Sequence, residues 1–87
     1  MIPTTVGSTS FFPCNHQGQH LFRVNADIPI ADALLYASNL QTCVNQLSLH
    51  VAMNGDSEHF TWALHHLGEM AKALTDEAIT VVTEARS

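Results

Sequence analysis

The sequence predicts an all-α fold, an antiparallel hairpin of two helices with a short extended segment before it. Two consecutive stretches carry apolar residues at alternating steps of three and four, and only the short Asn-Gly-Asp segment at 54–56 separates them. This spacing places the apolar residues along one side of an α-helix, as a narrow stripe that another helix must cover. Because the connection is short, the two helices are expected to pack in opposite directions.

Residues 1–18 are predicted to form a flexible N-terminal arm, followed by a helical hairpin domain over residues 19–87. The arm is rich in Thr, Ser, Gly, Pro, Asn and Gln, a composition typical of mobile segments. Phe11 and Phe12 interrupt it. Either this pair anchors the arm on another protein, or the segment packs loosely on its own domain, and the sequence leaves both alternatives open.

An extended strand is predicted at residues 21–24, because Leu21, Phe22 and Val24 favour strands and Gly18 bounds the run. A lone strand has unpaired backbone groups on both sides. It must therefore pair with a symmetry-related copy, pair with another protein, or lie against the helices without a sheet partner. Either of the first two would make it an interaction element.

The first helix is predicted near residues 29–53. Pro29 suits its first turn, where a missing N–H costs nothing, and Asp27 and Asp32 place negative charge near its N-terminus. Gly55 suits the left-handed position that closes a helix. The stripe of this helix comprises Ile30, Ala33, Ala37, Leu40, Val44, Leu47 and Val51.

The second helix is predicted near residues 57–85, with Asp56 or Ser57 as its cap and Gly68 as its weak point. At 1.5 Å per residue it is about 43 Å long and the first helix about 36 Å, so its apolar end should overhang and need cover. Its stripe comprises Phe60, Leu64, Leu67, Ala71, Leu74, Ala78, Val81 and Ala85.

Large apolar residues also lie off the stripes, where a monomeric hairpin would place polar ones. Either a symmetric four-helix dimer (or the folded-over N-terminal segment) buries them, or they bind a different protein. The dimer is favoured for most of this surface because closed symmetric pairs dominate oligomers. Trp62 and Leu49, near the turn, are the best candidates for a heterologous contact. The predicted interface residues are Leu21, Phe22, Val24, Leu35, Tyr36, Leu49, Trp62, Ile79 and Val82.

Charge argues against several classes of function. The formal net charge is −5, with eight acidic residues against three lysines and arginines. Three isolated cations cannot form the patch that direct binding of nucleic acid or an anionic membrane requires. No run approaches the roughly 20 apolar residues of a membrane span, and no targeting segment is visible. With two unlike cysteines expected to be free thiols, a cytoplasmic protein is predicted.

The sequence also predicts no enzyme, no metal and no cofactor. There is no glycine-rich phosphate loop, and the acidic residues are spread without a convergent pair. Cys43, beside the first stripe, is expected to be partly buried and inert. The histidines at 59, 65 and 66 fall on the polar side and lack a fourth ligand or a metal-binding motif. Protonating all six histidines would nevertheless reverse the sign of the net charge, so a pH response stays open.

Three segments, 21–24, 28–34 and 62–74, carry a family resemblance. The chain resembles a small bacterial domain-of-unknown-function family over roughly residues 20 to 80, which implies a short helical protein without enzymatic activity. It is also similar to small quorum-sensing antiactivators. That resemblance implies a protein that binds an autoinducer-responsive transcription activator and keeps it from dimerising.

Two classes of function follow. In the first, the protein is a regulatory interaction module that forms homodimers and occludes another protein, such as a transcription regulator. In the second, it is a helical dimer that senses a small ligand, a metal or pH through its histidines. Net acidity, missing site motifs and surplus apolar residues favour the first.

Overall fold

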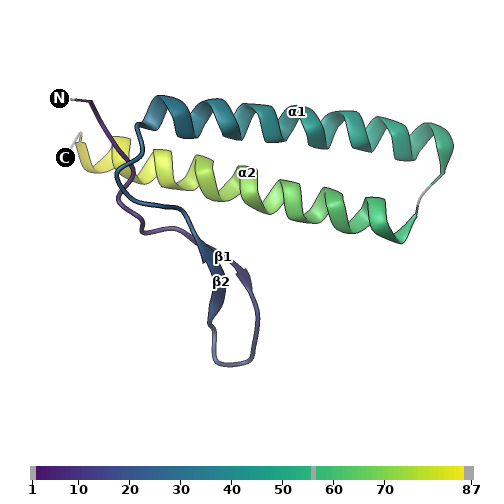
Figure 1. Cartoon of the computed structure of the whole chain (residues 1–87), viewed down its shortest axis with the longest axis horizontal. Coiled ribbons are helices and arrows are strands. Elements are labelled where there is room, and N and C mark those ends of the chain that lie inside the picture. The colour runs from purple at the N-terminus through teal and green to yellow at the C-terminus, as the bar shows by residue number, and fades with distance from the viewer. Residues whose placement is uncertain (1, 56, 86–87) are drawn as a thin grey trace.

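The computed structural model describes residues 2–55 and 57–85. Its elements follow in the order β1 (Ser10–Pro13), β2 (His20–Arg23), α1 (Ile30–Asn54) and α2 (Glu58–Ala85). The two helices lie side by side in opposite directions, and the two strands project away from them on the side of α2 (Figure 1). The predicted helical hairpin is confirmed, and a small antiparallel sheet accompanies it.

The helix ends follow the local sequence signals. The Ile30 N–H donates to the Pro3 carbonyl at 3.0 Å, which ties the start of α1 to the N-terminal segment. At the other end, the Gly55 N–H donates to the Val51 carbonyl, and Gly55 has φ 88, in the region that favours glycine. Ser57 Oγ accepts from the Phe60 N–H at 3.3 Å and caps α2. The alternative cap, Asp56, lies outside the described residues.

The sheet corrects the expectation of a lone strand. Strand β2 pairs with β1 of the same chain, with Phe11 opposite Phe22 and Ser10 opposite Arg23. The predicted arrangement without a sheet partner is therefore wrong, because the segment assigned to the flexible arm supplies a partner strand. Pairing satisfies the backbone groups on one side of β2, a contribution that the polar composition of the arm does not reveal.

The core follows the two stripes but is made mostly of small side chains. Ile30 and Val81 are its largest members on the helices, and Val24 adds to it from the chain that leads into α1. The stripe residues become half-buried toward the turn, where Phe60 is 37% exposed. The buried alanines are Ala33, Ala37, Ala71, Ala73 and Ala78.

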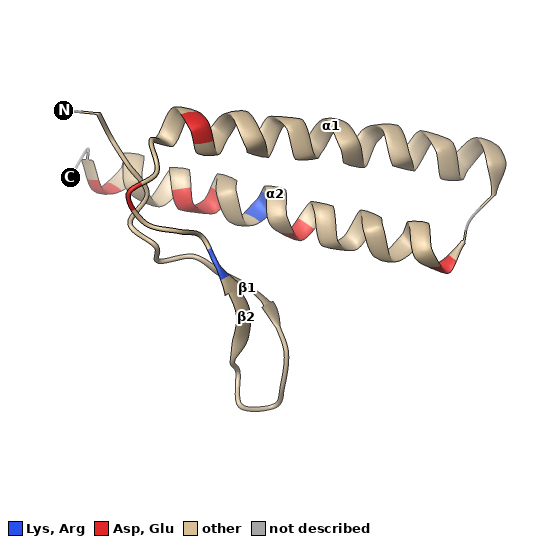
Figure 2. Cartoon of the chain, in the orientation of Figure 1, with Lys and Arg blue, Asp and Glu red and all other residues tan. Residues whose placement is uncertain are grey.

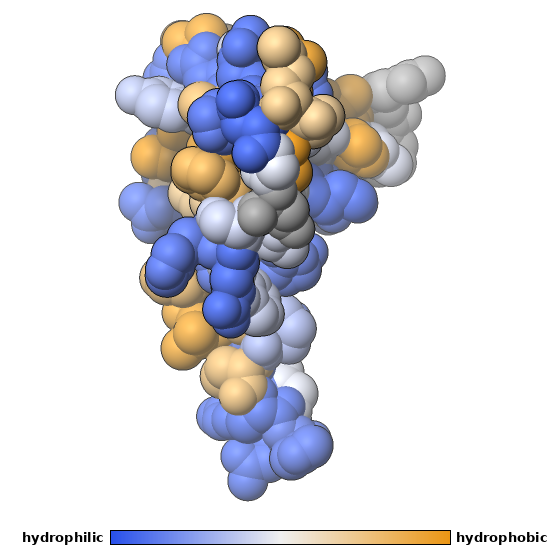
Figure 3. Space-filling model, turned by 90° about the vertical axis from the view of Figure 1, so that its right-hand side faces the viewer, coloured by the Kyte–Doolittle hydropathy of each residue, from blue (hydrophilic) through white to orange (hydrophobic). Residues whose placement is uncertain are grey.

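The molecule is a single flat layer. Its principal extents are 47 × 32 × 18 Å, and α1, α2 and the strands lie beside one another when it is viewed down the shortest axis (Figure 1). The accessible surface is 6273 Å², whereas a compact monomer of this mass exposes about 5,000 Å². The radius of gyration is 14.9 Å against about 12 Å for a compact domain of this length. Apolar side chains accordingly show on the outside, including at the turn end (Figure 3).

Candidate functional site

A buried carboxylate fixes the N-terminal segment on α2. The Glu77 side chain is 0% exposed, and its two oxygens accept hydrogen bonds from four consecutive backbone N–H groups. The donors are Val6 at 2.6 Å, Gly7 at 2.9 Å, Ser8 at 3.2 Å and Thr9 at 3.1 Å. The hydroxyls of Ser8 and Thr9 also donate, at 3.1 and 2.8 Å. The backbone therefore wraps around one side chain, and β1 starts directly after it.

These bonds keep Glu77 ionised although it is buried. Burial is the largest single influence and raises the pKa of the carboxyl group. Hydrogen bonds from Val6, Thr9, Gly7 and Ser8 act in the opposite direction and together lower its pKa from 4.5 to about 2. A negative charge is thus held under the N-terminal segment at all ordinary pH values. The sequence analysis missed this role because it treated Glu77 as one of several scattered helix acids.

Aromatic rings from the strands and from α2 form one surface, here named the aromatic patch and defined by Phe12, Phe22, Trp62, His65 and His66. Phe12 lies 5.0 Å from the His66 ring and 5.4 Å from the Phe22 ring, measured between centroids. Trp62 stacks on His66 at 5.8 Å and is 54% exposed. Leu21 and Glu69 border the same depression of about 490 Å³. The patch combines exposed aromatic area with imidazole groups that can exchange hydrogen bonds with a partner.

The backbone at Phe12 departs from that of a regular strand and brings the rings of the two N-terminal phenylalanines into contact. Adjacent side chains of a regular strand point to opposite faces of the sheet. Phe12, however, has φ 57, in the left-handed region that a residue with a bulky side chain rarely adopts. As a result, the Phe11 and Phe12 rings lie 5.0 Å apart, and both contact Phe22. Such strain costs on the order of 1–3 kcal/mol and is typical of functional surfaces.

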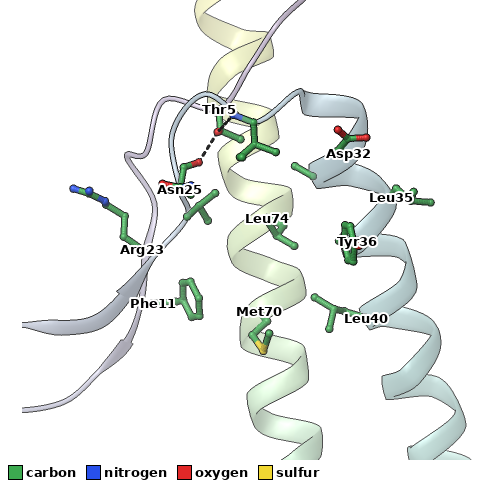
Figure 4. Close-up of a pocket in the computed structure, with 13 residues that line it drawn as sticks. Thr5, Phe11, Arg23, Asn25, Asp32, Leu35, Tyr36, Leu40, Met70 and Leu74 are labelled. Atoms are coloured by element: carbon green, nitrogen blue, oxygen red, sulfur yellow. Dashed lines mark hydrogen bonds between the residues drawn. The ribbon is translucent and has the colours of Figure 1, made fainter.

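A second surface feature is an apolar groove of about 820 Å³, here named the trough. Helix α2 lies between the strands and α1 and contributes Met70 and Leu74 to the groove (Figure 4). Leu35, Tyr36 and Leu40 line it from α1. From the strand side it is lined by Phe11, Val24 and Ile28.

The Thr5 hydroxyl and the two backbone groups that it contacts beside the trough are already paired within the chain. Thr5 is 1% exposed, and its hydroxyl donates to the Asn25 carbonyl at 2.5 Å (Figure 4). The same hydroxyl accepts from the Ile28 N–H at 3.0 Å. An occupant of the trough would therefore be held mainly by apolar contact rather than by hydrogen bonds to these groups.

The structure divides the predicted interface residues among several places. Leu21, Phe22 and Trp62 meet at the aromatic patch, whereas Leu35 and Tyr36 border the trough. Val24 borders the trough too, but it is only 7% exposed and belongs to the core. The remaining three are exposed and lie outside both sites, one on α1 and two near the end of α2: Leu49, Ile79 and Val82.

Residues outside the predicted interface set complete both sites. Phe12 and His66 hold the centre of the aromatic patch, and Met70 forms part of the trough. For Phe12 the sequence did offer a signal, because an anchor on another protein was one of the two alternatives for the adjacent aromatics Phe11 and Phe12 in a polar segment. The place of Met70 in the trough could not be predicted, because the sequence does not distinguish it from other residues beside a helix stripe.

The thiols and histidines present no assembled chemical centre. Cys43 is exposed, which corrects the expectation of partial burial, since none of the described elements covers that side of α1. Cys14 is exposed and free as well. Over residues 2–55 and 57–85 there is no group of three or more His, Cys, Asp or Glu placed to hold a metal ion. Neither of the described helices combines the length and the apolar character that crossing a membrane requires.

Comparison with known proteins assigns a family. Residues 5–81 match the model of the DUF3077 family, whose description is "protein of unknown function". No curated protein and no solved structure matches the chain. The matched region starts in the segment that wraps around Glu77 and ends at Val81, in the buried part of α2. Since the match spans most of the chain, the protein belongs to the DUF3077 family.

Proposed function

We propose that this protein is a non-enzymatic regulator that forms a homodimer with a four-helix arrangement and occludes a surface of another protein. The observation that carries the proposal is the exposed aromatic patch, which gathers rings from segments far apart in the sequence and presents Trp62 at 54% exposure. Tryptophan is strongly enriched among the residues that dominate binding energy at protein interfaces.

The charge distribution supports a protein partner over a direct contact with nucleic acid. Acidic residues are spread along α2, α1 carries only Asp32, and the described cations are isolated from one another (Figure 2). Lys72 is also paired with Asp76, with Nζ 2.7 Å from Oδ1. A duplex-binding surface needs several cations side by side to neutralise phosphates. Such a chain would control transcription by binding a regulator rather than by competing for its DNA.

The class of partner that we propose is a transcription activator, and a quorum-sensing activator is the first to test. The resemblance to quorum-sensing antiactivators supports this choice. The exposed apolar area of the aromatic patch supports it as well. The protein would act in the bacterial cytoplasm and would cover the surface through which the activator dimerises. Trp62 is the proposed anchor, supported by Phe22 and Leu21, with Leu49 as a separate contact on α1.

The proposal predicts that Trp62→Ala weakens binding to the partner by about 2 kcal/mol or more, which is the loss expected for a buried interface anchor. The tagged protein is used to isolate a stoichiometric partner from cell lysate, and the affinity is then measured with both proteins purified. Asn39→Ala, an exposed change on α1, is the matched control. Adding the wild-type protein should also reduce binding of the activator to its DNA.

Two results would contradict the proposal. In one, Trp62→Ala loses its helical circular dichroism, which would make Trp62 a structural residue. In the other, the purified partner binds wild type, Trp62→Ala and a Phe22→Ala variant with equal affinity, which would exclude the aromatic patch.

A further inference from the structure

We infer that the trough is the dimer interface and that its occupant is a second copy of this chain. The inference rests on the homodimer in the proposed function and deepens it by assigning the dimer to one face of the molecule. Three features of the molecule support it: the exposed area, the side chains on the two faces of the helix pair, and the charges on the two sides of the trough.

The excess of exposed area is comparable to the area that one dimer interface would bury. The chain exposes 6273 Å², which is about 1,200 Å² more than a compact monomer of the same mass. A standard specific interface covers roughly 800 Å² on each partner. A layer only 18 Å thick also lacks the second layer of secondary structure around which a domain builds its core. Covering one face of the layer with an identical layer would remove much of the excess and supply the missing half of the core.

The two faces of the helix pair differ in what they offer a second layer. On the trough side, large apolar side chains stand open, with Tyr36 at 63%, Leu35 at 56% and Met70 at 37% exposure. The groove along the other side of the α1–α2 contact is smaller, about 440 Å³. Apart from Leu34, its lining is small or polar: Ala37, Ser38, Gln41, Gly68, Ala71, Lys72 and Thr75. Burying the trough thus removes more apolar surface from water than burying the other groove would.

The two sides of the trough carry opposite charges. Arg23 borders it from β2, and Asp32 borders it from α1, across α2 (Figure 4). Neither of the two forms a salt bridge with another described residue. A twofold axis parallel to the helices exchanges the two sides, so the strand side of one copy faces the α1 side of the other. Arg23 of each copy is then paired with Asp32 of its mate, which makes the contact self-complementary as a twofold interface must be.

The test is sedimentation of the full chain between about 1 and 100 µM, with adjacent leucines as matched variants. Leu35→Asp places a charge in the trough, whereas Leu34→Asp places it in the other groove; their side chains are 56% and 45% exposed, so both variants should keep their helicity. We expect a wild-type dimer, dimerisation at least about tenfold weaker for Leu35→Asp and for Tyr36→Asp, and little change for Leu34→Asp.

A charge exchange provides a readout that misfolding cannot imitate. Arg23→Asp and Asp32→Arg alone should each weaken the dimer, and the double variant should recover most of the lost affinity. Weakening by Leu34→Asp but not by Leu35→Asp would overturn the face assignment and leave the proposed dimer intact. A monomeric wild type would overturn the dimer as well, and binding of an apolar dye in the trough of that monomer would show a small-molecule site instead.

Discussion

The two ends of the helix pair carry the same apolar spacing but reach different degrees of burial. At the end away from the turn, Ile30, Ala33, Ala78 and Val81 are all buried, with at most 8% exposure. At the turn end, the stripe residues are only half-buried, and Phe60 is 37% exposed. The difference arises because the N-terminal segment is fixed on α2 near Glu77, at the end of the helix pair away from the turn. The stripe of apolar residues therefore determines which side of a helix is covered. How deeply those residues are buried depends on a third element.

The largest expected effect comes from placing a charge at the buried end. Ala78→Asp should cost on the order of 3–5 kcal/mol of unfolding free energy and leave the protein largely unfolded, because the carboxylate would be buried without a partner. Ala52→Asp makes the same chemical change at an exposed position near the turn and should cost less than about 1 kcal/mol. Urea unfolding followed by circular dichroism measures both values. Equal losses would show that the two ends are equally packed.

Removing the charge that fixes the N-terminal segment should have the next largest effect. Glu77→Gln keeps the size of the side chain but replaces one acceptor oxygen by an NH₂ group that faces N–H donors. We expect a loss of about 3 kcal/mol, from the difference between the pKa values of 4.5 and about 2. The segment before β1 should become sensitive to protease while the helices persist. Glu58→Gln, an exposed change on the same helix, is the control.

Acid should weaken the same anchor gradually. Because the folded protein lowers the pKa of Glu77, its contribution to stability is fully present above about pH 4.5 and is lost as the pH falls toward 2. The free energy of unfolding should decline by up to about 3 kcal/mol across this window, and the decline should be much shallower in Glu77→Gln. Urea titrations at several pH values between 5 and 2 measure the slope. A slope that is unchanged in the variant would assign the acid sensitivity to other carboxyl groups.

The features that could be predicted from the sequence are those that depend on neighbours along the chain. The bounds of both helices, the two stripes and the position of Gly55 all follow from local spacing and backbone preference. The exposed positions of Trp62 and Leu35 followed from the same spacing.

The structural features that could not be predicted from the sequence depend on contacts between residues far apart in the chain. The bond from the Val6 N–H to Glu77 joins positions 71 apart, and no local pattern marks Glu77 as different from other helix acids. The pairing of β1 with β2 was missed because the composition of residues 1–18 resembles that of a mobile arm. Cys43 was expected to be partly buried because its place beside the stripe suggested cover that no element of the described chain provides.

The position of Glu77 also sets the order in which the chain can complete its fold during synthesis. The donors at 6–9 leave the ribosome first, whereas the carboxylate that holds them lies in the last helix. Closing so long a loop carries an entropy cost that helix formation within α1 does not. The N-terminal segment is therefore made first and fixed last. Until α2 has emerged, the phenylalanines of the strands have no helix to pack against. The newly made chain is then most prone to aggregate.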